Sequence, residues 1–247
     1  WVRQPTVPLE RVKMALNVDM VGRMTDGKLI VGGSRTGIGM RKLLSDRALP
    51  SDLWIDFTWE YKENSDHWPL FERGIPSLYI HTGLHDDYHR PSDDVERLNV
   101  EGIRKTADFL MTAVAEAADA ERLPEYRSAA RLDTLARQCA QEAPLPPSDR
   151  PARLGLAWRA DPAEPSTVFI TRVNNNSPAE AAGLQLHDRI YQLDGQPIGD
   201  ETELLKSVQA RLADDARRLA LVVERKGRVF DVEVELESAD EESDPAL

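Results

Sequence analysis

The chain has 247 residues, a formal net charge of -12 and 41% hydrophobic residues. This length and apolar fraction are enough for one large domain or two modest domains with buried cores. The acidic excess argues against a nucleic-acid backbone as partner, because no basic stripe is present. A single cysteine, Cys139, excludes a disulfide within the chain. No apolar stretch approaches the length of a membrane-spanning helix.

Residues 1–120 alternate short apolar runs with helical patterns, which is typical of an α/β domain with layered sheet and helices. The predicted strands are 17–21, 28–31, 54–61 and 77–81, and the predicted helices are 36–48, 65–73 and 100–118. The first strand has no helix before it, and a parallel sheet needs neighbouring strands. We therefore expect further sequence before Trp1.

Residues 121–151 combine a charged helical stretch with the sequence PLPPSDRP. Prolines at this density stop helices and stiffen a connection, so we expect an interdomain linker here. A second domain is predicted at 152–237, with strands at 153–158, 168–173, 190–193, 219–224 and 228–236 and helices at 178–182 and 201–211. The acidic tail 238–247 is predicted to be disordered.

Asp19 ends an apolar run and is followed by Gly22, so its carboxylate could project from the carboxyl end of a strand. Ligands of open α/β sheets gather at such strand ends. A lone aspartate that caps a turn is the simpler interpretation of the same residues.

His89 lies in the sequence YHRPSDD, where Pro91 fixes the backbone and Asp93 or Asp94 is available to orient the imidazole ring. Zinc accepts neutral histidine nitrogen and carboxylate oxygen. A metal-bound imidazole usually donates its other ring proton to a carboxylate or a carbonyl. An exposed loop histidine is the ordinary alternative.

Two further motifs are better explained without catalysis. Ser65, Asp66 and His67 are adjacent, whereas the members of a Ser-His-Asp triad converge from separate segments, so Ser65 is predicted to cap a helix. The glycine-rich run at 31–39 has Ile-Gly where a phosphate-binding loop requires Lys-Ser or Lys-Thr. A turn before a helix explains this run better.

Three segments, in this order, resemble the second half of a known enzyme domain: NVDMVGR, SDHWPLFERGIPSLYIHTG and HDDYHRPSDDVERLNVEGI. They are similar to the zinc-dependent aminopeptidases of metallopeptidase family twenty-eight. The resemblance covers about residues 10–120. It implies part of a three-layer sheet-and-helix fold, two co-catalytic zinc ions and a peptide or protein substrate.

The resemblance also implies roles for particular residues. Asp19 matches a ligand of one zinc ion, and His89 matches a ligand of the other. Asp66 and Asp93 match acidic positions that lie beside the ligands. A tyrosine that stabilises the oxyanion in some relatives lies near the position of Tyr61, out of clear register.

Other ligands of the family have no counterpart in these residues. They are a histidine in an H-x-D-like motif, a bridging aspartate and a Glu-Glu pair that carries the general base. Two metals a few ångströms apart would share a hydroxide and hold both the scissile carbonyl and the free N-terminal amine. We therefore expect the chain, alone, to bind no stable zinc pair and to hydrolyse nothing.

The segments RLGLAW, VNNNSPAEAAGLQLHDRIYQLDGQPI and ETELLKSVQARL, within 152–237, resemble a PDZ domain of the bacterial protease-associated type. This resemblance implies a small β-barrel-like fold with two helices. It implies that a peptide adds a strand beside an exposed edge, while backbone amides hold its terminal carboxylate. The implied binding residues are Leu154, Gly155 and Leu156 in the carboxylate loop, and Val168 and Ile170 in the groove.

Two functions therefore compete. The first is the carboxyl-terminal part of a zinc aminopeptidase that removes N-terminal residues from peptides and carries an appended PDZ domain. The second is a non-catalytic, peptidase-like protein that acts through its PDZ groove, by binding a peptide or by gating another site. A PDZ-bearing serine protease is excluded, because no G-x-S-x-G-like segment is present. Since such relatives are often exported in bacteria, an exported location is an expectation of the resemblance.

Overall fold

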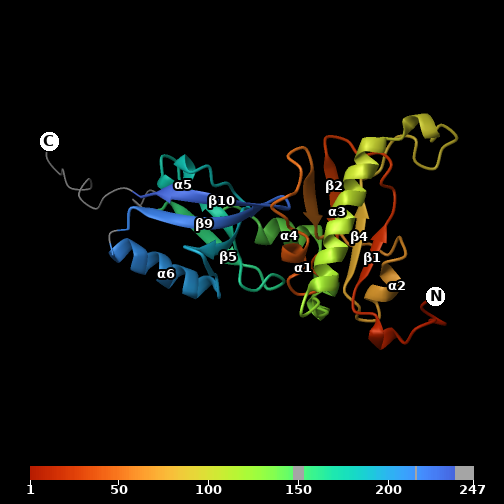
Figure 1. Cartoon of the computed structure of the whole chain (residues 1–247), viewed down its shortest axis with the longest axis horizontal. Helices are drawn as coiled ribbons and strands as arrows, with labels where there is room; N and C mark the ends of the chain where they lie inside the picture. Colours follow the sequence, from red (N-terminus) through yellow and green to blue (C-terminus); the bar gives the residue numbers. More distant parts are fainter. Residues whose placement is uncertain (147–152, 215, 237–247) are drawn as a thin grey trace. The chain divides into compact units, whose positions relative to one another are not determined.

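The computed structural model describes residues 1–146, 153–214 and 216–236. These residues form two compact units (Figure 1). The first unit contains Trp1–Cys139 with Lys226–Arg228, and the second contains Ala140–Arg225 and the chain from Val229. The predicted disorder of the acidic tail concerns residues outside the described ranges.

A four-stranded mixed sheet forms the centre of the first unit, with strand order β1-β4-β2-β3. Its strands are β1 (Ala15–Val18), β2 (Lys28–Gly32), β3 (Trp54–Thr58) and β4 (Ser77–His81). Strand β1 runs parallel to β4, and β2 runs parallel to β3, while β2 and β4 are antiparallel. The carboxyl ends of β1 and β4 therefore lie at the same edge.

Helix α3 (Val100–Asp119) lies across one face of this sheet (Figure 1). It begins at Asn99, whose side-chain oxygen accepts a hydrogen bond from the amide of Gly102. Its buried Phe109 and Ala113 join the hydrophobic core formed with alternate residues of the strands, which are Leu29, Val31, Ile55, Phe57, Leu78 and Ile80. The period of two along each strand separates this apolar face from the opposite one.

The opposite face carries the intervening side chains, including Tyr79 of β4. It is covered by the short helix α2 (Trp68–Phe71), whose Phe71 lies 5.2 Å from the ring of Tyr61. Helices on both faces of a sheet make the layered α/β fold that the sequence predicts.

One predicted helix is much shorter than expected. The pattern at 36–48 yields only α1 (Met40–Leu43). Gly39 has a positive φ of 79°, and the hydroxyl of Thr36 donates to backbone carbonyls, with distances of 2.8 Å to Gly33 and 3.0 Å to Ser77. These side-chain bonds hold the segment as a turn, because they compete with the helical hydrogen bonds.

The described residues of the expected linker form hydrogen bonds within each unit. In the first unit, Asp133 accepts hydrogen bonds from Arg35 at 2.9 Å and Arg127 at 2.7 Å. In the second unit, the amide of Leu145 donates to the carbonyl of Thr171 at 2.8 Å. The helical elements here are short, at Ser128–Leu132 and α4 (Leu135–Gln141). Residues 147–151, which complete the proline-rich run, lie outside the described ranges.

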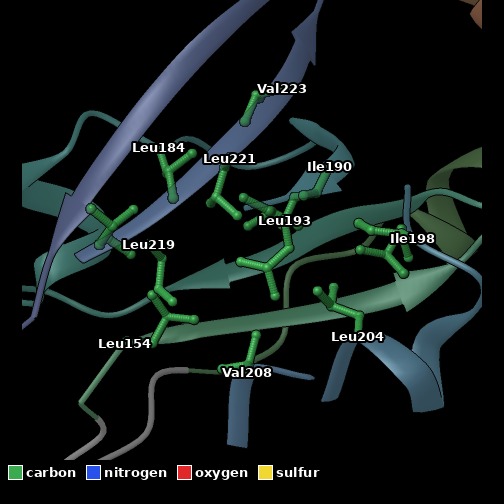
Figure 2. Packing of buried hydrophobic residues seen from close by; sticks show 14 of the residues in the cluster. Leu154, Leu184, Ile190, Leu193, Ile198, Leu204, Val208, Leu219, Leu221 and Val223 are labelled. Atoms are coloured by element: carbon green, nitrogen blue, oxygen red, sulfur yellow. The ribbon is translucent and has the colours of Figure 1, made fainter. Parts of the chain in front are cut away.

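The second unit is a sheet of order β10-β9-β7-β6-β5, with the short β8 paired to β7. Its strands are β5 (Leu156–Ala160), β6 (Val168–Val173), β7 (Arg189–Leu193), β8 (Gln196–Pro197), β9 (Arg218–Arg225) and β10 (Arg228–Glu235). Its helices are α5 (Pro178–Ala181) and α6 (Glu201–Ala213). Apolar side chains from the sheet and from α6 form one core, with Leu193 in its middle and Leu204 and Val208 reaching it from α6 (Figure 2).

Charged residues in the HDRI segment are also buried in this unit. Asp188 is fully buried and accepts two hydrogen bonds from Arg225, at 2.6 Å and 2.7 Å. Arg189 lies 2.9 Å from Asp161, and both side chains are nearly inaccessible. Because an unpaired buried charge is costly, these pairs fix the turn before β7 in one arrangement.

Candidate functional site

The first candidate site lies where the parallel strands β1 and β4 end. Asp19 directly follows β1, and its amide donates to the carbonyl of Ile80 at 3.1 Å. His81 is the last residue of β4. Asp19 therefore stands at the carboxyl edge of the sheet, where the sequence predicts it.

The carboxylate of Asp19 is oriented by a polar chain from the neighbouring segments. The hydroxyl of Ser65 lies 3.4 Å from an Asp19 oxygen and accepts a hydrogen bond of 2.8 Å from the side chain of Asn17. Ser65 was predicted to cap a helix, and this prediction is wrong, because the helix begins after His67. Its hydroxyl contacts Asp19 instead.

A ladder of rings runs along the sheet beneath this edge. Ring centroids are separated by 4.5 Å between Tyr61 and His67, 4.7 Å between His67 and Tyr79, and 4.6 Å between Tyr79 and His81. The two pairs that include Tyr79 are stacked, whereas the rings of Tyr61 and His67 are tilted by 45°.

Both histidines of the ladder are favoured in the neutral form. Burial lowers the pKa of His67, which is fully buried. Burial also lowers the pKa of His81, and this effect exceeds that of the negative charges of Asp19, Asp56 and Glu60, which raise it. The Nδ1 atom of His81 accepts a hydrogen bond from the amide of Gly83 at 3.1 Å. A neutral His81 therefore carries its proton on Nε2, where it can act as a donor.

His89 lies on an exposed loop, with its ring stacked on that of Tyr88 at 3.9 Å. Its backbone φ of 56° is in the left-handed region, which is unusual for a residue other than glycine. Backbone strain of this kind clusters at functional sites.

Tyr79 lies between His67 and His81 in the ladder of rings. Burial, then the charge of Asp19, then Tyr88, each raise the pKa of the Tyr79 phenol. The sequence interpretation did not include Tyr79, His81 or Tyr88, although alternate positions of a strand that ends beside Asp19 could have indicated the first two.

The contacts of the two acidic residues expected beside the ligands are with other groups, and their predicted roles stay predictions. Asp93 accepts a hydrogen bond of 2.6 Å from Arg23 and lies 3.9 Å from His85 Nε2. Asp66 is exposed, and its charge only partly opposes the effect of burial, which lowers the pKa of the adjacent His67.

Tyr61 has a packing role in this structure. Its phenol is largely buried, and its hydroxyl donates to the carbonyl of Ser77 at 2.8 Å. Burial raises the pKa of this phenol far above its usual value. Because the hydroxyl proton is already engaged inside the fold, the geometry does not favour the oxyanion role that the sequence suggested.

Among the described residues, no group of three or more histidine, cysteine, aspartate or glutamate side chains could hold a metal ion. Asp19 and His89 have the donor atoms that zinc accepts, but a zinc ion in a protein takes three or four ligands. The two side chains therefore fit part of a metal centre. Nor does any helix in the described ranges have the length and apolar character needed to cross a membrane.

The second candidate site is the loop before β5. The carbonyl of Leu154 accepts from the amide of Ala179 at 3.1 Å, and the carbonyl of Gly155 accepts from Asn174 at 2.8 Å. In a trans peptide the N–H points opposite to the carbonyl, so the amides of Gly155 and Leu156 are turned away from these partners. Two successive outward amides form a cradle for an anion.

Gly155 is required by this loop. Its φ is 76°, and a Cβ atom built at this position would lie 2.2 Å from the Cβ of Ser177. Leu154 is buried in the core, while Leu156 is partly buried and packs against it. Strand β5, which follows, is the end strand of the sheet and lies next to α6.

Val168 and Ile170 do not line a groove, and this prediction is corrected. Both side chains have no accessible surface and belong to the core of the second unit. Strand β6, which carries them, lies between β5 and β7. The alternation along β6 directs these two side chains inward, so an added peptide would instead contact β5 and α6.

Family comparisons match the two units separately. The model of peptidase family M28 matches residues 1–114, and the PDZ domain model matches residues 150–236. The chain therefore joins a segment of M28 peptidase type to a PDZ domain. It is a peptidase-related protein with a PDZ module.

Among curated proteins, the chain is similar to the regulator of sigma-E protease RseP of Salmonella typhimurium and to the regulator of sigma E protease of Salmonella typhi. Each is 38% identical over 79 residues, which is 32% of this chain and 16% of the relative. The aligned part thus spans about a sixth of the length of these relatives.

Solved structures that are similar to this chain include the LapA aminopeptidase of Legionella pneumophila. The match has a TM-score of 0.38 and 20% identity, and it covers 44% of this chain and 32% of that chain. They also include the HtrA3 PDZ domain bound to a phage-derived ligand, with a TM-score of 0.30 and 25% identity over 34% of this chain and 83% of that chain.

Proposed function

We propose that the first unit is part of a zinc-dependent aminopeptidase domain, and that it supplies Asp19 and His89 to a two-metal centre. One observation carries this proposal: Asp19 lies at the edge of the sheet where the parallel strands β1 and β4 end, within the segment that the M28 family model matches. The remaining ligands and the general base would come from residues outside this sequence.

When bound, the two metal ions would supply a hydroxide nucleophile and polarise the scissile carbonyl. The residues of this chain would position that chemistry. Ser65 orients the carboxylate of Asp19, and the stack on Tyr88 orients the imidazole of His89. The neutral ring of His81 keeps a donor hydrogen at the same edge of the sheet.

A two-ligand site explains why this chain alone should be inactive. Two protein ligands leave most of a zinc coordination sphere to water, so binding is weak and no paired metal site forms. Measuring zinc content and leucine-anilide turnover of the purified 247-residue chain tests this directly. We expect neither a stable zinc pair nor turnover, and a clear stoichiometry of two zinc ions with turnover contradicts the proposal.

The ligand assignment is tested in a longer protein that contains this segment. His89→Asn should remove one metal ion and most peptidase activity, while keeping the left-handed backbone, which asparagine tolerates. His187→Asn is the matched control, because His187 also has a positive φ, of 70°, but lies in the second unit. Unchanged activity in the His89 variant counts against the assignment.

We further propose that the second unit binds the C-terminal carboxylate of a peptide. The outward amides of Gly155 and Leu156 support this, since they form a cradle at the start of the end strand β5. The far end of that strand is partly occupied, because the carboxylate of Glu201 lies 3.4 Å from the amide of Ala160. A bound peptide would therefore pair mainly with the first residues of β5.

Fluorescence polarisation with a labelled peptide that has a free, apolar C-terminal residue tests this binding. Amidation of the peptide terminus should weaken binding by about tenfold or more, because hydrogen bonds to a charged group are about twice as strong as neutral ones. Equal binding of the two peptides would favour a role for this unit in gating or docking rather than carboxylate recognition.

A further inference from the structure

We infer that Arg23 is a positioning residue that sets the place of His89 relative to Asp19, by clamping the loop 83–98 from its interior. Where this concerns metal binding, it rests on the proposed function above. The geometry of the clamp is independent of that proposal.

Both ends of this loop are fixed to the segment that follows Asp19. The carbonyl of Met20 accepts from the amide of Thr82 at 3.2 Å and from its hydroxyl at 2.7 Å. The carbonyl of Gly22 accepts from the amide of Asn99 at 2.9 Å. The ends of the loop are therefore secured, but its middle, which carries His89, is largely exposed.

Arg23 reaches the middle of the loop on both sides of His89. Its Nη2 atom donates to Asp93 at 2.6 Å and to Asp87 at 3.2 Å. The Arg23 side chain is only 14% exposed, and that of Asp87 is 20% exposed. One guanidinium thus holds a residue two positions before His89 and a residue four positions after it.

Loss of this clamp would remove the cation that the two carboxylates share, and would leave Asp87 with the hydrogen bond from Ser92 and the charge of Arg97. Asp87 and Asp93 converge on one nitrogen atom, so removing it ends two attractions and weakens the link between the two halves of the loop. The left-handed backbone of His89, with φ of 56°, persists only while its surroundings enforce it. We therefore expect the turn that carries the imidazole to relax when Arg23 is replaced by a neutral residue.

Hydrogen exchange of the full 247-residue chain measures this effect without metal or substrate. In Arg23→Gln, the amides of the loop 83–94 should exchange about tenfold faster, as expected for losing about 1.4 kcal/mol of local stability. Arg23→Lys should recover most of the protection, because an ammonium group can also serve both carboxylates. Exchange of the β4 amides should stay unchanged.

Arg104→Gln is the matched control. Arg104 also bridges two carboxylates, Glu101 and Asp108, but on the exposed surface of α3. This variant should leave exchange in the loop unchanged. Equal exchange in the parent and in Arg23→Gln overturns the inference, as does equal acceleration in Arg23→Gln and Arg104→Gln.

The position of the imidazole is followed by the NMR signal of the His89 Hε1 proton, which lies against the ring of Tyr88. Arg23→Gln should move this signal toward its value in an unfolded peptide, and Arg23→Lys should restore it. If Arg23→Gln does not fold, Asp93→Asn removes the clamp from the other side and should give the same shift. An unmoved signal in the folded variant overturns the inference.

In a longer protein that contains this segment, Arg23→Gln should weaken zinc binding about tenfold or more. Failure of the parent to bind zinc would contradict the proposed function, while the exchange and NMR results would still decide the role of Arg23. Tight zinc binding that is equal in the parent and in Arg23→Gln would overturn the inference alone.

Discussion

The two units present their binding groups in different ways. In the peptidase-type unit, the candidate groups are side chains on separate segments, Asp19 after β1 and His89 on a long loop. In the PDZ unit, the candidate groups are the backbone amides of Gly155 and Leu156. A backbone site is complete once its loop has folded, whereas a side-chain site needs every contributing segment.

The largest expected effect concerns the backbone site. Gly155→Ala should destabilise the second unit by about 2–3 kcal/mol and abolish peptide binding, because the new Cβ meets Ser177 and the φ is positive. Thermal unfolding and fluorescence polarisation measure the two losses.

Gly195→Ala is the matched control for this substitution. Gly195 has a φ of 75°, but no heavy atom lies within 4 Å of a Cβ at this position. It should cost only about 1 kcal/mol and keep peptide binding. Equal losses in the two alanine variants would mean that backbone conformation alone, and not the contact with Ser177, shapes the loop.

A second prediction concerns pH and the ring ladder of the first unit. Burial lowers the pKa of His67 and of His81 in the folded state. As the pH falls below about 6.5, the unfolded chain therefore takes up protons that the folded unit does not. The first unit should therefore lose stability as the pH falls through this range, with its full stability above that pH.

Exchange of the β4 amides between pH 5 and pH 8, corrected for intrinsic exchange, measures this loss of stability. His67→Phe should reduce the slope to about half, because one of two titrating rings is removed while the stacking is kept. An unchanged slope in this variant would show that His67 does not contribute to the pH dependence.

A third prediction compares the caps of the main helices. Asn99→Ala should cost about 1–2 kcal/mol, because its side chain caps α3 and also donates to the carbonyl of Met24 at 2.8 Å. Asp200→Ala removes only the cap of α6 and should cost about 1 kcal/mol. Chemical denaturation measures both values, and a larger cost for Asp200→Ala would contradict this ordering.

The smallest effects are expected at the candidate zinc ligands. Asp19→Asn and His89→Asn should change the stability of the first unit by less than about 0.5 kcal/mol, because both side chains are exposed. Chemical denaturation of the chain measures this difference. A loss of several kcal/mol would indicate that these residues maintain the fold rather than a binding site.

The sequence predicted the strands well where apolar alternation was uninterrupted. Strand β4 was predicted with its observed limits, whereas β1 begins two residues earlier than predicted and ends at Val18. The helix predicted at 36–48 is shortened to Met40–Leu43, because the Thr36 hydroxyl bonds to distant backbone at Ser77 and holds the preceding residues in a turn. Such tertiary contacts are not visible in a local pattern.

The candidate site was predicted in part for a similar reason. The motifs identified Asp19 and His89, but the partners of these residues depend on which segments the fold brings together. Asp93 pairs with Arg23, seventy residues away in sequence, although His89 is closer. In the second unit, the glycine of the LGL sequence predicted a loop conformation, while burial of Val168 and Ile170 followed from the place of β6 inside the sheet.

The central claim is that Asp19 and His89 bind zinc together with ligands from outside this sequence. Zinc-edge anomalous diffraction from crystals of a longer protein that contains this segment tests it most directly. We predict zinc peaks about 2.0–2.2 Å from a carboxylate oxygen of Asp19 and from a ring nitrogen of His89. Zinc peaks in such crystals that touch neither side chain would contradict the account.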